Sequence, residues 1–209
     1  MAEAEGRSQE PETKRFDWFS LMIQTLLVIF GVFAGLWVND WHTNVQNQKD
    51  AREAGKRLKM EVENNLKLVT ASRDYHRGLS TALKEGGFNQ SDKIPSLRIF
   101  HRGFISPAAV NDSVWQTAQT TQLTRYMDYE DLLLFSSAYS RQARYVAQAD
   151  LAGAALYDQL MNNGHHGLCR KWANLLDIIQ TFAYREEQLI QVYTRILKDL
   201  SREHNSGAS

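Results

Sequence analysis

The histidine and cysteine side chains near residue 165 form the one cluster of soft metal ligands in this 209-residue sequence. His165, His166 and Cys169 lie within five positions of one another. A histidine at position i and a cysteine at i+3 or i+4 can share one helical face and bind zinc. The sequence holds no second pair at zinc-finger spacing. A polar turn followed by an inert thiol is therefore the favoured interpretation, and we expect neither a metal nor another cofactor.

Other signatures of catalysis are missing from the sequence. It contains no nucleophile elbow, phosphate-binding loop, zinc-protease motif or glycine-rich dinucleotide turn. Glu186 and Glu187 are adjacent, so they point to different faces of a helix and make a poor acid–base pair. Basic and acidic residues balance at 24 each, which gives no indication of nucleic-acid binding. We predict that the protein is not an enzyme; a small metal-dependent enzyme is the least favoured alternative.

Four polar residues occupy positions where the helical repeat predicts burial. Burying a carboxylate at such a position is costly unless it is paired. Gln142, Arg144, Tyr145 or a residue of the first helix could pair with Glu186. The favoured interpretation is that these residues fix the register of a bundle; ligand sensing is the alternative, with His76 as a pH switch. The buried polar seam is predicted to contain Asn65, His76, Gln142 and Glu186.

Long stretches with helical periodicity and only three prolines predict an all-α fold. A long helix is expected over 42–85, because Gly86 and Gly87 would end it. A helical hairpin is expected over about 128–203, with Asp128 as the N-cap and a break at Gly164. The second hairpin helix is predicted from Leu168 to Arg202. Together with the N-terminal span, these elements predict an antiparallel helical-bundle domain over 42–205 with a long distal loop.

The irregular segment 86–127 connects the long helix to the hairpin. It is too apolar for a free linker, and short helices are expected near 95–101 and from about 111–113 onward. Capping of the bundle is the favoured role of this loop. If the loop instead binds a ligand or partner, the expected residues are Phe100, His101, Arg102, Phe104 and Trp115.

The 22 residues from Trp18 to Asn39 pass without a charge. A helix of this length covers about 30 Å, the thickness of the hydrocarbon core of a bilayer. A transmembrane helix over 18–41 is therefore predicted, after a short polar tail over 1–17; a cleaved signal or a soluble core helix are the alternatives. Two sets of residues support the span: the interface anchors Trp18, Trp37 and Trp41, and a close-packing face formed by Gly31, Ala34 and Gly35.

The run from Gly31 to Trp41, GVFAGLWVNDW, resembles the N-terminal span of a group of uncharacterised bacterial single-pass membrane proteins with a helical extramembrane domain. The segment from Ser113 to Leu123 is similar to a short helix that these proteins carry in mid-domain. Trp37 departs from the polar residue that is more usual at its position. The resemblance covers about a fifth of the chain and implies a bacterial cell envelope, but it implies no activity and no catalytic residues.

Lys14 and Arg15 precede the span, whereas 39–48 contain no lysine or arginine. The excess of positive charge just before the span predicts a cytoplasmic N-terminus and a periplasmic C-terminal domain at the bacterial inner membrane. The predicted function is that of a membrane-anchored helical interaction or scaffold protein, an accessory subunit of an envelope complex. A ligand-sensing bundle that signals through a partner is the alternative. The expected partners are the lipid bilayer and either a second copy of the chain or a membrane-protein complex, and not nucleic acid.

Overall fold

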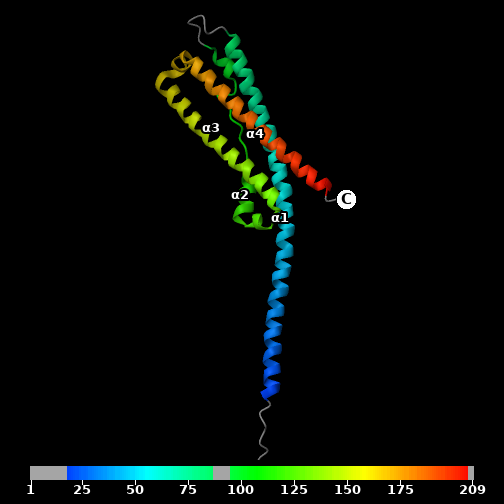
Figure 1. Ribbon diagram of the computed structural model, residues 1–209. Helices are drawn as coiled ribbons and strands as arrows, with labels where there is room; N and C mark the ends of the chain where they lie inside the picture. The colour runs from blue at the N-terminus through cyan, green and yellow to red at the C-terminus, as the bar shows by residue number, and fades with distance from the viewer. Residues whose placement is uncertain (1–17, 87–94, 207–209) are drawn as a thin grey trace, which may run out of the picture. The chain divides into compact units, whose positions relative to one another are not determined.

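The computed structural model describes residues 18–86 and 95–206, and every regular element within these ranges is helical. This confirms the predicted all-α class. The predicted tail over 1–17 lies outside the described residues. Figure 1 shows the elements in chain order, namely the α-helices α1 (Trp18–Glu85), α2 (Ser113–Thr120), α3 (Tyr129–Arg170) and α4 (Trp172–Ser206) and the 3-10 helices η1 (Leu97–Phe100) and η2 (Leu123–Tyr126).

The chain divides into two compact units between Gln46 and Asn47. The boundary falls five residues after the predicted limit between 41 and 42. Helix α1 is one uninterrupted helix of 68 residues that belongs to both units and ends at Glu85, as the two following glycines predict. Within the first unit, α1 contains an apolar window that is long enough to cross a membrane, and none of that window is buried in the protein.

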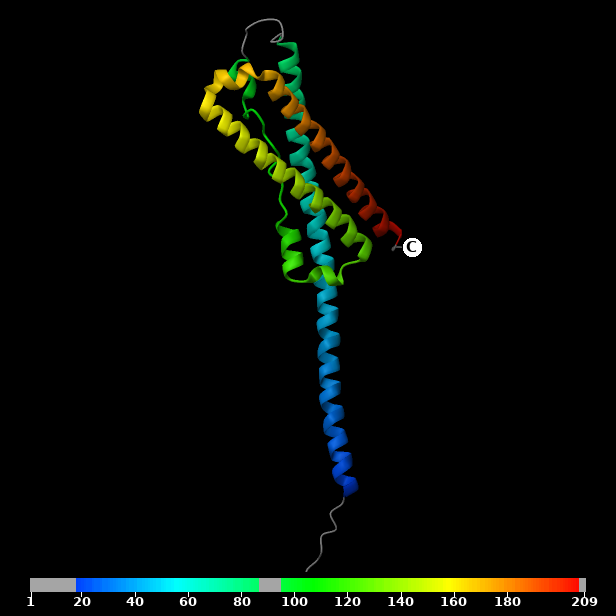
Figure 2. The same ribbon diagram turned by 60° about the vertical axis from the view of Figure 1, so that its left-hand side comes forward.

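The core of the second unit lies between α1, α3 and α4 (Figure 2). Helix α1 contributes residues that recur every three or four positions, so that they lie on one face of the helix. Helices α3 and α4 add aromatic and branched side chains from their facing surfaces. The largest fully buried apolar side chains are those of Leu58, Val62, Val69, Leu83, Phe135, Leu175, Ile179 and Tyr193.

The hairpin turn differs from the prediction. Helix α3 was expected to end at Gly164 and α4 to begin at Leu168, but α3 continues to Arg170 with a kink at Gly164, and α4 begins at Trp172. Gly164 has φ 63° and ψ −178°, a conformation open to glycine. The residues after it contain no proline, and Leu168 and Cys169 are buried against the core, so a further helical turn forms despite Gly167.

The extended segment, residues 101–112 between η1 and α2, has no regular structure, yet most of its side chains are at least partly buried. In Figures 1 and 2 this segment appears as a green strand-like trace that runs beside the helices of the bundle. Its backbone has no helix or sheet to supply hydrogen bonds. Side chains from the helices must therefore satisfy its buried N–H and C=O groups.

Candidate functional site

Glu186, at the middle of α4, is fully buried and accepts hydrogen bonds at both carboxylate oxygens. The Tyr145 hydroxyl donates to Oε1 over 2.8 Å, and Nδ1 of His76 lies 2.8 Å from Oε2. The backbone N–H of Ser106 donates to Nε2 of His76 over 3.0 Å, and that of Ala108 donates to the Tyr145 hydroxyl over 2.8 Å.

These contacts fix the direction of the hydrogen bonds. A backbone N–H can only donate, so Nε2 of His76 is the acceptor and Nδ1 is the nitrogen that donates to Glu186. The Tyr145 hydroxyl accepts from Ala108 and donates to Glu186. Both carboxylate oxygens of Glu186 are therefore acceptors.

Asn65 and Gln142 meet in a second buried group, about three turns of α1 away from His76. The Asn65 amide donates to Gln142 Oε1 over 3.1 Å and to the Asn111 carbonyl over 2.6 Å. In return, the Asn111 N–H donates to Asn65 Oδ1 over 2.9 Å. The Tyr193 hydroxyl donates to Gln142 Oε1, and the Gln142 amide donates to the Asn111 carbonyl over 3.0 Å. The pair therefore binds both backbone polar groups of a single residue, Asn111.

Glu61 of α1 is the centre of a third group of buried hydrogen bonds, and it was not among the residues predicted from the sequence. One carboxylate oxygen accepts from the Tyr139 hydroxyl, and the other accepts from the Val114 N–H over 3.0 Å in the first turn of α2. A carboxylate at this place caps the helix and interacts favourably with its dipole. Glu61 lies three residues after Leu58 and four before Asn65, so the seam spacing alone would have revealed it.

The four predicted seam residues thus lie in the core, and their partners are parts of the same chain. Asn65 and Gln142 contact each other, as do His76 and Glu186. Of the candidates to pair with Glu186, Tyr145 and a residue of the first helix, His76, form hydrogen bonds with it. Burial raises the pKa of the Tyr139, Tyr145 and Tyr193 hydroxyls well above their usual range, with neighbouring carboxylates adding to the effect. The seam therefore positions the extended segment.

The predicted metal ligands are only partly brought together. Nδ1 of His165 lies 3.5 Å from the Cys169 sulfur, whereas His166 makes a T-shaped contact with the His165 ring at 6.0 Å between centroids. Burial raises the pKa of the Cys169 thiol to about 11, so the thiol is protonated at neutral pH. Over residues 18–86 and 95–206, no three His, Cys, Asp or Glu side chains are arranged to hold a metal ion.

The residues of the predicted binding loop do not form one site. Phe100 is buried in a cluster with Leu79 and Leu83, and it packs against Phe104 at 4.7 Å between ring centroids. Trp115 belongs to the other core cluster, stacked on Tyr139 at 5.2 Å. His101 and Arg102 are exposed, and both rest on Tyr75, the guanidinium at 5.0 Å from the ring centroid. The aromatic residues of this segment therefore cap the bundle.

The residues predicted to lie in the membrane are exposed within the first unit. Trp18, Trp37 and Trp41 are 68%, 74% and 63% exposed. A Cβ added at Gly31 or Gly35 would meet no atom within 4 Å, and Ala34 is only partly covered. This face of α1 is therefore open to lipid or to another helix.

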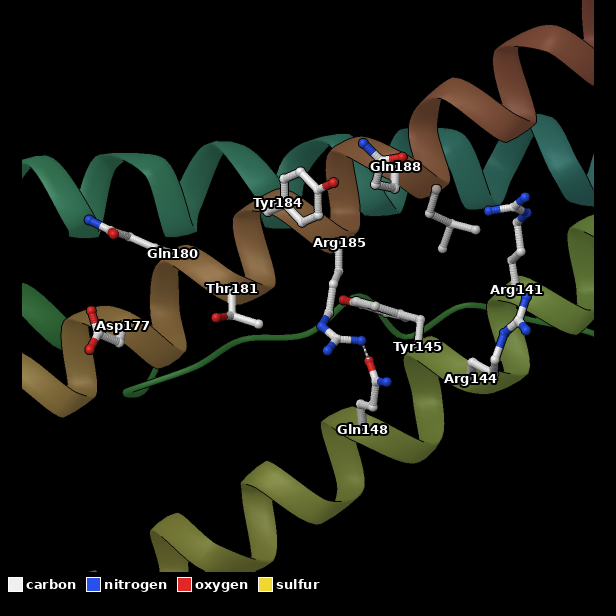
Figure 3. A pocket seen from close by; sticks show the side chains of 11 residues that line it. Arg141, Arg144, Tyr145, Gln148, Asp177, Gln180, Thr181, Tyr184, Arg185 and Gln188 are labelled. Carbon is white, nitrogen blue, oxygen red and sulfur yellow. Dashed lines mark hydrogen bonds between the residues drawn. The ribbon is translucent and has the colours of Figure 1, made fainter.

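An open groove lies between α3 and α4 in the second unit, with a volume of about 970 Å³ (Figure 3). Three arginines line it: Arg141 and Arg144 from α3, and Arg185 from α4. Arg185 reaches across the groove and donates a hydrogen bond to the Gln148 side chain, as the dashed line in Figure 3 shows. From the sequence, Arg144 was predicted only as a possible partner for Glu186, and the groove was not predicted.

Comparison with known proteins gave no relative: no family model, no curated protein and no solved structure matches the chain.

Proposed function

We propose that the protein is a membrane-anchored helical interaction protein, an accessory subunit of a complex in the bacterial cell envelope. The observation that carries the proposal is the fully exposed apolar window of α1. An apolar helix of this length that is exposed throughout the described residues of its unit is unstable in water, whereas the hydrocarbon core of a bilayer can solvate it.

The bundle supports an interaction role over an enzymatic one. Its buried polar side chains, including Glu61, Asn65, His76 and Glu186, are hydrogen-bonded to the chain itself. We therefore expect the second unit to act through its exposed side chains, by binding another macromolecule. The proposed orientation places the N-terminus in the cytoplasm and the bundle in the periplasm, because Lys14 and Arg15 flank the span.

The proposal is tested on the full chain in inner-membrane vesicles and spheroplasts. We expect the protein to stay in the pellet after a carbonate wash, and protease added outside spheroplasts to remove the bundle. Release of the intact chain into the supernatant would contradict the membrane anchor. A bundle protected from external protease in intact spheroplasts would contradict the orientation.

Cross-linking in mild detergent then tests the interaction. We expect a species larger than the monomer. If the face of Gly31 and Gly35 forms a dimer, Gly35→Ile should reduce that species, because a branched side chain keeps two helix backbones apart. Phe33→Ile, on another face of the same helix, is the matched control and should leave it unchanged. A strict monomer with no co-purifying protein would contradict the interaction role.

A further inference from the structure

The groove between α3 and α4 is lined by a set of like charges. Arg141 and Arg144 are three residues apart on α3 and so lie on one face of that helix. Arg185 faces them from α4, and Figure 3 shows all three side chains at the groove. Asp177 is the only acidic residue in the lining, eight residues before Arg185 on α4. The formal charge of the lining, three arginines against one aspartate, is therefore positive.

These arginines have no acidic partner in the part of the chain that the structure describes. Arg73 and Arg77, by contrast, both bind Glu187 on the other side of α4 at 3.0 Å. Arg185 donates only to the neutral amide of Gln148. Glu186 does not face the groove, because it is fully buried and bound by the Tyr145 hydroxyl in the groove wall. Three permanently charged guanidinium groups thus line an open groove without an ion pair among the described residues.

The shape of the groove favours an elongated occupant. Its α4 wall runs from Asp177 to Leu189, which at 1.5 Å per residue is about 18 Å. An extended peptide of about five or six residues has this length. The groove is open along its side, whereas a site for a small molecule encloses most of its ligand. Gln180, Thr181 and Gln188 add side-chain amide and hydroxyl groups that can bind a peptide backbone.

We propose that the groove binds an acidic segment of a protein partner, with the carboxylates of that segment against Arg141, Arg144 and Arg185. The planar guanidinium group matches a carboxylate with two parallel hydrogen bonds, which favours Asp and Glu side chains as the groups recognised. The inference rests on the proposed interaction function and supplies the chemistry of its partner.

The test uses the full chain in a neutral detergent, with fluorescently labelled hexaglutamate as the probe. We expect saturable binding by fluorescence anisotropy that weakens as salt is raised, and no binding of hexaglutamine. The double variant Arg141→Gln with Arg144→Gln should weaken binding roughly tenfold or more. The matched control is Arg52→Gln with Arg195→Gln, which removes the same charge from exposed positions outside the groove and should bind as the unaltered chain does.

Four results would overturn the proposal. They are an absence of hexaglutamate binding, an equal loss in the control variant, unchanged binding in the groove variant, and full competition by inorganic phosphate at equal charge concentration, which would indicate a site for small anions. Circular dichroism of both variants checks that the bundle is folded. If hexaglutamate fails to bind while the cross-linked species persists, the groove proposal is wrong and the interaction function stands. If the cross-linked species is absent while hexaglutamate still binds to the groove, the interaction function is wrong and the recognition of carboxylates by the groove stands.

Discussion

Glu186 shows how a carboxylate is accommodated in a helical core. Each of its oxygens accepts one hydrogen bond, from Tyr145 and from His76. A buried polar group that is left without a hydrogen bond costs about 1–3 kcal/mol, so these two contacts decide whether the carboxylate can be buried. The donors are themselves fixed, because backbone N–H groups of Ser106 and Ala108 occupy their acceptor sites. The two backbone N–H groups thus set the direction of the hydrogen bonds that reach the carboxylate.

Glu186→Ala should lower the free energy of unfolding by about 2–5 kcal/mol, because it leaves the Tyr145 hydroxyl and the Nδ1–H of His76 buried without an acceptor. Urea denaturation of the full chain in detergent, followed by circular dichroism, measures this loss. Glu187→Ala is the matched control: that carboxylate is partly exposed and binds two arginines at the surface, so its loss should cost about 1 kcal/mol or less. Equal losses in the two variants would contradict the assigned role.

At the scale of elements, the extended segment before α2 takes the place that a further helix would have in a regular bundle. It receives its hydrogen bonds from side chains: Asn65 and Gln142 at Asn111, His76 at Ser106, and Glu61 at the start of α2. The polar seam is therefore a consequence of an irregular element inside the bundle. The hairpin has its own irregular point at Gly164, where α3 kinks before the chain reverses.

Gly164→Ala should destabilise the protein by about 1–3 kcal/mol, because φ 63° with ψ −178° is a conformation that an L-residue adopts only under strain. Gly153→Ala is the control within the same helix. Gly153 lies in the regular part of α3, and an added Cβ meets nothing within 4 Å, so alanine should stabilise the helix by about 0.4–1 kcal/mol. Thermal unfolding of the full chain gives the sign of both changes. A stabilising Gly164→Ala would show that the kink is not required.

At the scale of the whole molecule, the buried tyrosine hydroxyls couple the stability of the second unit to alkaline pH. Burial raises the pKa of Tyr139, Tyr145 and Tyr193 in the folded state, while in the unfolded chain each titrates near pH 10. Above about pH 10 the unfolded state therefore binds fewer protons than the folded state. Their contribution to stability is complete below about pH 10 and is lost as the pH rises further.

We expect the free energy of unfolding to fall above about pH 10 by up to about 1.4 kcal/mol per pH unit for each of the three tyrosines. Urea denaturation between about pH 8 and about pH 11 measures the slope, and phenolate absorbance reports which tyrosines ionise while the chain is folded. Tyr193→Phe should reduce the slope. Tyr157→Phe should leave it unchanged, because that side chain is 72% exposed. A slope that does not respond to Tyr193→Phe would contradict the linkage.

Helical periodicity predicted Asn65, His76, Gln142 and Glu186 as buried positions, and all four are buried. The three-four repeat that joins Phe135, Tyr139 and Gln142 leads next to Val146, but Tyr145 is the buried residue at this turn and Val146 is 37% exposed. A repeat of three and four residues averages 3.5 per turn, whereas a straight helix has 3.6, so the buried position of one turn can fall on a neighbouring residue. The same repeat leads further along α3 to Leu156, which is buried.

The amino-acid sequence by itself determined the apolar span, the all-α class, the N-cap at Asp128 and the end of α1 at Glu85, because each depends on neighbouring residues within one helix. Only the tertiary structure decided which groups meet across elements. Glu61 meets the start of α2, and Asn65 and Gln142 bind Asn111, so these contacts join residues from 31 to 53 positions apart in the sequence. Arg141 and Arg185 line one groove from two helices. Such contacts follow from how the helices pack, which local periodicity does not specify.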